Sequence, residues 1–234
     1  MGNGAAGTIT VGTVDANGIL FNAPGSGNYT LNSGTITLGG TTPTITANVN
    51  ATIGSGIAGS AGLVKEGTGT LSFSSQKTYT GDTTINAGIL DLTGGGGSGG
   101  TIRGAVTVNA AGTLRLSFGD ATGYGTGADR IATINLVGGN MHVNTTSNQT
   151  LGSATINMTG ASITGVGGSN IDFFAGSSAL NSLASATSST ISGTQIKIRQ
   201  AGGLTMTVAD GAAATDLSIS SVVANDGAYT TAPL

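Results

Sequence analysis

A short unit repeats along the chain: a glycine or other small turn residue, then a few residues in which apolar side chains alternate with Thr, Ser or Asn. Clear copies begin at Gly7, Gly34, Gly69, Gly88 and Gly112, and looser copies include 134–136, 141–143, 154–158, 195–198, 204–208 and 216–219. A period of two predicts β-strands with one buried and one solvated face. Glycine suits the turns between them because it adopts positive φ at no steric cost.

The spacing of these units favours a solenoid over a sandwich. By subtraction, the clear starts lie about 27 residues apart (Gly7 to Gly34), about 19 (Gly69 to Gly88) and about 24 (Gly88 to Gly112). Hairpins of a sandwich would place turns every 8–12 residues, whereas a β-solenoid stacks coils of roughly 20–30 residues with variable loops. We therefore expect an all-β protein, with residues 1–234 forming one continuous body of roughly ten coils at a spacing of about 4.8 Å.

Composition supports this interpretation. Only 7% of the residues are charged, and Glu66 is the one glutamate in the sequence, so the surface must consist largely of Thr, Ser, Asn and Gly. Thr, Ile and Val dominate the apolar runs, and β-branched side chains fit a pleated surface better than a helix. The chain has no cysteine, which excludes disulfides, zinc–thiolate sites and cysteine nucleophiles.

Charge and hydropathy argue against two kinds of partner. The net charge is −3, and the seven basic residues are scattered rather than gathered in a stripe, so we expect no nucleic-acid binding. No apolar run approaches the roughly 20 residues of a membrane span, so we expect none in this segment.

Residues 62–92 read GLVKEGTGTLSFSSQKTYTGDTTINAGILDL and resemble the autotransporter-associated β-strand repeat, also called the passenger-associated transport repeat. Ser75, Phe73 and Lys77 replace the usual Gly, Leu and Asn of that repeat, which loosens one turn and keeps the strand pattern. The positions that we assign to the repeat motif, with a structural role, are Leu63, Lys65, Gly67, Gly69, Thr70, Leu71, Phe73, Tyr79, Gly81, Thr83, Ile85, Gly88, Leu90 and Leu92.

The resemblance implies a right-handed parallel β-helix outside a Gram-negative cell, anchored at the outer membrane or secreted, in which the repeat aids secretion and folding. Leu71 and Phe73 should point inward. We expect Tyr79 to cover the side of a coil with its hydroxyl in water, and the substitution Lys77→Ala to be nearly silent.

Few residues could carry chemistry. His142 lies between Met141 and Val143, and alternation should turn it outward as a solvated strand residue. Asp120 and Asp129, beside Arg130, are the carboxylates with the best chance of lying close together, and loop solvation explains them best. The nonapeptide Ca²⁺ repeat and a phosphate-binding loop are both missing from the sequence. We therefore predict no catalytic residue, no cofactor and no metal site.

These observations predict a non-enzymatic structural or adhesive stalk segment from a longer tandem-repeat protein of the bacterial surface. The expected partners are the protein itself, through end-to-end contact or neighbouring repeats, and host or surface glycans. Two alternatives stay open: a carbohydrate-active β-helix, which needs a groove of aromatic and acidic side chains, and a trimeric phage fibre module.

Overall fold

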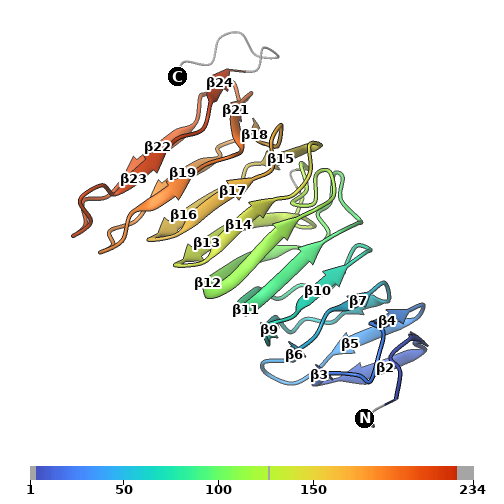
Figure 1. Ribbon diagram of the computed structural model, residues 1–234. Helices are drawn as coiled ribbons and strands as arrows, with labels where there is room; N and C mark the ends of the chain where they lie inside the picture. Colours follow the sequence, from blue (N-terminus) through green and yellow to red (C-terminus); the bar gives the residue numbers. More distant parts are fainter. Residues whose placement is uncertain (1–3, 126, 226–234) are drawn as a thin grey trace.

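A computed structural model describes residues 4–125 and 127–225, and it consists of parallel strands stacked into a β-solenoid of about 9 turns. The turns follow one another along a single axis from the N-terminal to the C-terminal end (Figure 1). No helix occurs in the described part of the chain. The predicted all-β, parallel solenoid fold is therefore confirmed.

Each full turn passes over three faces. The first face is a ladder of parallel strands that begins at the N-terminal end and recurs in every turn. Its members are β1 (Thr8–Thr10), β4 (Tyr29–Asn32), β7 (Ala51–Ile53), β10 (Thr70–Phe73), the second half of β11 (Thr83–Leu92), the second half of β12 (Gly104–Leu116), β14 (Asn140–Val143), β17 (Ser162–Gly165), β20 (Ser189–Ile191) and β23 (Leu217–Ile219).

The second face joins the first because β11 and β12 run continuously around the corner between them, so the two faces form one 17-stranded sheet. Its ladder contains β3 (Gly18–Phe21), β6 (Thr44–Ala47), β9 (Leu63–Glu66), the first halves of β11 and β12, β13 (Ile131–Val137), β16 (Thr155–Thr159), β19 (Ala179–Ser182) and β22 (Thr205–Val208).

The third face is interrupted. Its N-terminal sheet holds β2 (Thr13–Ala16), β5 (Thr35–Leu38) and β8 (Gly56–Ala58), and its C-terminal sheet holds β15 (Asn148–Gly152), β18 (Asn170–Ala175), β21 (Gln195–Ile198) and β24 (Val223–Asn225). Between these sheets the chain crosses the third face in the segments 74–82, 93–103 and 117–130, in which the described residues form no named strand.

The core is built by stacking like on like. Leu71, Leu90, Leu114 and Met141 are register partners in four successive turns, and each is at most 1% exposed. By subtraction they are 19, 24 and 27 residues apart along the chain. The strands keep one register while the segments between them absorb the difference in length, which explains the uneven spacing in the sequence.

Neutral amides connect successive turns on the outer side of the second face. On the second face Asn135, Asn157 and Asn181 stack in register, and the amide nitrogens of Asn157 and Asn181 each donate to the side-chain oxygen of the asparagine in the preceding turn at 2.9 Å. These hydrogen bonds connect successive turns without using charged side chains.

Leu71→Asp tests the inward assignment. It would place an unpaired carboxylate at a position that is 0% exposed between Ala51 and Leu90, and we expect it to unfold this part of the stack, because burying a charge costs several kcal/mol (on the order of 3–5). Thr52→Asp, on the outer side of the neighbouring strand, is the control and should change stability by about 0.5 kcal/mol or less. Equal urea unfolding midpoints for the two variants would contradict the assignment.

Candidate functional site

The segment 63–92 passes over five successive faces, or about one and two-thirds turns, so its two halves lie on each other. Its first half supplies β9 and β10, the stretch 74–82 crosses the third face, and its second half is β11. Leu63 pairs with Thr83, Leu71 with Leu90, and Phe73 with Leu92. The repeat motif therefore contains both sides of one interface between successive turns.

The glycines of the motif serve two different needs. Gly67 and Gly88 have φ values of 79° and 64°, the left-handed region that side chains disfavour. Gly81 instead allows close approach, because a Cβ there would lie 2.3 Å from the backbone nitrogen of Gly62. Gly69 is similar, at 2.5 Å from the carbonyl carbon of Val49.

Lys65 points into the solenoid. It stands in the inward ladder of the second face between Ile45 and Ile85 and is 0% exposed. Its Nζ donates to the carbonyl oxygens of Gly67 at 2.8 Å and of Ala87 at 2.9 Å, with a further bond to Glu66. Gly67 and Ala87 lie at the corner between the second and first faces in two successive turns. The ammonium group therefore connects this corner of one turn to the same corner of the next. Burial lowers the pKa of Lys65 to about 8, against the attraction of Glu66.

Lys77 connects two successive turns at the corner between the first and third faces. It is 0% exposed, and its Nζ donates to the carbonyl oxygens of Ile53 (2.8 Å) and Ser55 (2.7 Å) in the preceding turn and to Ser75 Oγ (2.9 Å). Nζ also lies 5.1 Å from the ring centre of Phe73. The expectation that Lys77→Ala is nearly silent is therefore wrong, because the alternation of the strands does not extend around this corner.

Tyr79 also differs from the expectation. It is 0% exposed, and its hydroxyl bonds to Thr83 Oγ1 at 2.6 Å rather than to water. Burial raises the pKa of Tyr79 well above its usual value. The ring thus fills the interior where the third face lacks a strand.

The residues considered for chemistry lie apart from this turn. His142 is half-buried between the inward Met141 and Val143 and contacts Thr164 Oγ1 at 2.9 Å. Asp120 accepts a hydrogen bond from the backbone of Thr150 at 2.9 Å and lines a hollow on the third face. Asp129 is not among the residues that line that hollow. The described residues contain no group of three or more His, Cys, Asp or Glu side chains placed to hold a metal ion.

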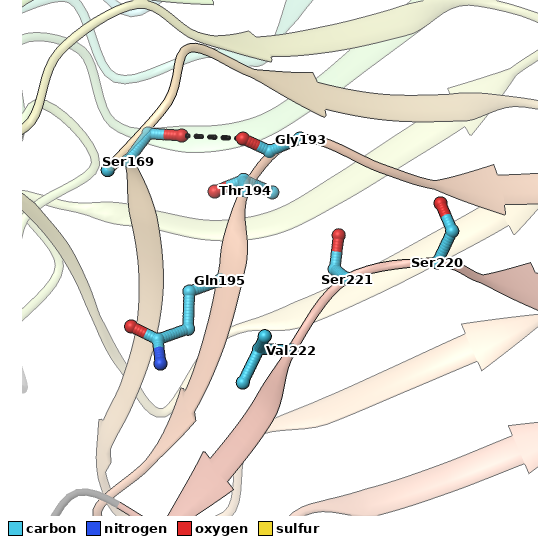
Figure 2. Close-up of a pocket in the computed structure, with 8 residues that line it drawn as sticks. Ser169, Gly193, Thr194, Gln195, Ser220, Ser221 and Val222 are labelled. Carbon is cyan, nitrogen blue, oxygen red and sulfur yellow. Dashed lines mark hydrogen bonds between the residues drawn. The ribbon is translucent and has the colours of Figure 1, made fainter.

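A second hollow, of about 280 Å³, lies at the corner before β24 (Figure 2). Ser169 Oγ donates there to the carbonyl of Gly193 at 3.3 Å, while Thr194 Oγ1 and Ser221 Oγ have no partner among the described residues. None of the eight lining side chains is titratable. The hollow can offer hydrogen bonds to a neutral group but has no acid, base or charged nucleophile.

The sequence pattern missed an ion pair on the third face. Asp172 is paired with Arg199, and the ring of Phe174 lies over the guanidinium group. A signal was present, because two adjacent aromatic residues, Phe173 and Phe174, break the alternation of a strand that has one buried face.

Lys77→Met tests the connection that Lys77 makes between these turns. It keeps the apolar stem but removes the donor to Ser55 and Ile53, and we expect the free energy of unfolding to fall by about 1–3 kcal/mol. The pH profile should change as well. Loss of water around the amine lowers the pKa of folded Lys77 to about 7, whereas the unfolded value is about 10.4. The unfolded chain then binds more protons between these values, so the stability of the wild type should rise with pH across this window.

Urea unfolding at several pH values between these limits measures both effects. Lys77→Met should show a shallower rise, to which Lys65 still contributes and which the raised pKa of Tyr79 opposes near the upper end of the range. Gln76→Met, at the exposed neighbouring position, removes no titratable group and should keep the full slope. A wild-type stability that falls from neutral to alkaline pH would contradict this account.

Two comparisons with known proteins agree with the structure. The family pattern of the passenger-associated transport repeat matches residues 63–92. A segment of 91 residues, 38% of this chain, is 38% identical to the "Adhesin BmaC autotransporter" of Brucella suis biovar 1 (strain 1330) and corresponds to 3% of that protein. No solved structure matches the chain. Residues 63–92 therefore match a passenger-associated transport repeat, and the chain is similar over 38% of its length to an autotransporter adhesin.

Proposed function

We propose that this chain is a non-enzymatic, rigid stalk segment of a surface-exposed or secreted adhesive passenger. The observation that carries the proposal is that the transport repeat lies within the 17-stranded parallel sheet, with strands in register on both sides. The similarity to an autotransporter adhesin supports the adhesive setting. About 9 turns at a spacing of about 4.8 Å give the segment a length on the order of 40 Å.

The hollows support a role without catalysis. The hollow before β24 is lined by neutral side chains only. At the hollow on the third face, Asp120 accepts a hydrogen bond from the backbone of Thr150, and the nearby Asp172 is paired with Arg199. A glycosidase would need two carboxyl groups facing each other across a cleft. Among residues 4–125 and 127–225 no helix is long and apolar enough to cross a bilayer.

Surface display tests the proposal. Residues 1–234 are placed between a secretion signal and an outer-membrane translocator barrel, and exposed chain is measured by antibody binding and added protease. We expect the wild type and the control Val137→Lys, at a 45% exposed outer position, to be displayed equally. Leu71→Asp should reduce the surface signal several-fold, because the folded stack is lost. Equal display of Leu71→Asp would contradict a role that depends on the folded solenoid.

We also propose that this segment associates with further copies of itself end to end. In the first turn Ile9 and Val14 occupy inward positions yet are 41% and 44% exposed, and in a late turn Met206 and Val208 are 38% and 51% exposed. Around Ile9 and Val14 lies an apolar hollow of about 300 Å³. Strand edges and apolar positions of this kind match the interface that each internal turn makes with its neighbour.

Sedimentation velocity over a range of concentrations tests the end contacts. The wild type should sediment faster as concentration rises, and the double variant Val14→Lys/Val208→Lys should stay monomeric, because each lysine places a charge in the apolar end. Val137→Lys adds the same charge at a similarly exposed position on the side and should associate like the wild type. A wild type that is monomeric throughout, or a double variant that still associates, would contradict the proposal.

A further inference from the structure

The C-terminal part of the third face carries a hollow of about 260 Å³ that crosses several turns. Asp120 and Tyr124 come from the segment 117–130, and the other contributors lie on or next to β15, β18 and β21, which are neighbours in the same sheet (Figure 1). Four successive turns span about 14 Å at a spacing of about 4.8 Å. The hollow is therefore long enough for a short oligomer rather than a single small group. Its lining residues are Asp120, Tyr124, Asn148, Thr150, Phe174 and Arg199.

A β-bulge directs one aromatic ring into this hollow. Leu151 pairs with Phe173 and Gly152 with Ala175, so Phe174 is the extra residue of β18. Phe173 is 1% exposed and fills the core, whereas Phe174 is half-buried on the other side. Bulges commonly re-aim a side chain next to a binding site.

The Phe174 ring is held by a charged pair. It lies 4.7 Å from the guanidinium carbon of Arg199. Arg199 Nε donates to Asp172 Oδ1 at 2.8 Å, and Nη2 donates to the other carboxylate oxygen. The Asp172 side chain is 1% exposed and that of Arg199 21%. Such a pair carries a large desolvation cost, and it fixes the guanidinium group and the ring at the hollow.

The charges around the hollow cancel. Asp120 and Asp172 contribute two negative charges, while Arg199 and Lys197, the register partner of Asp172, contribute two positive ones. A balanced field gives no advantage to an acidic or a basic ligand. The hydrogen-bonding groups that line the hollow include a carboxylate, an amide and a hydroxyl, from Asp120, Asn148 and Thr150.

The aromatic residues complete the chemistry. Tyr124 is 41% exposed at the hollow, and Phe174 offers a second ring. Aromatic faces pack against the C–H faces of pyranose rings, while carboxylate, amide and guanidinium groups bond to sugar hydroxyls. We propose that this hollow binds a neutral oligosaccharide. The proposal deepens the adhesive part of the proposed function, because it gives the stalk a ligand site of its own.

NMR titration of the ¹⁵N-labelled 234-residue chain tests the proposal. The neutral probes are maltotriose, cellotriose, chitotriose and lactose, and the acidic probe is 3′-sialyllactose, each added to about 10 mM. We expect at least one neutral probe to shift the amide signals of Tyr124, Asn148, Thr150 and Phe174. Tyr124→Ala should weaken that binding at least about fivefold, because it removes an exposed aromatic contact.

Phe118→Ala is the matched control. Phe118 lies on the same segment, is 44% exposed and does not line the hollow, so its loss should leave the affinity unchanged. No shifts with any neutral probe, equal binding by Tyr124→Ala, or tighter binding of 3′-sialyllactose than of every neutral probe would overturn the proposal. If any of these results is found while surface display is normal, oligosaccharide binding is contradicted and the stalk function is not. Failure of the one proposal can thus be told apart from failure of the other.

Discussion

Register stacking of parallel strands is the constraint on which the rest of this structure depends. Each turn satisfies its backbone groups and buries its apolar side chains only against the turns on either side, as the ladder from Leu71 to Met141 illustrates. The strand ladders do not supply hydrogen-bond donors to every carbonyl oxygen at the corners, where the chain bends out of the sheet. In the transport repeat two buried lysines meet this need by binding corner carbonyls of adjacent turns.

The chain has few charged residues, and it places two of them, Lys65 and Lys77, where one side chain must bond to several backbone carbonyl groups. On the second face, neutral amides connect successive turns at no desolvation cost for ions. Lys65 and Lys77 reach several acceptors at once from a flexible stem, which a short neutral side chain could not do. Between its two sheets the third face has no named strand, and there the buried Tyr79 and loop segments fill the space.

The strands could be predicted from the sequence because alternation is a local property, and a one-residue shift would turn every apolar side chain outward. Lys77 and Tyr79 could not be placed this way, because the stretch 74–82 is not a strand and its side chains follow the corner. The hollow on the third face was missed for another reason. Tyr124, Phe174 and Arg199 come together only through turns of unequal length, which no regular spacing in the sequence reveals.

One feature of the repeat bears on how such proteins change in length. The two halves of the segment 63–92 pair with each other across one turn, Leu63 with Thr83 and Leu71 with Leu90. A duplicated copy would carry this internal interface with it, and only the junction between the two copies would be new. With one further crossing of the third face, each added copy would lengthen the rod by two turns, about 10 Å.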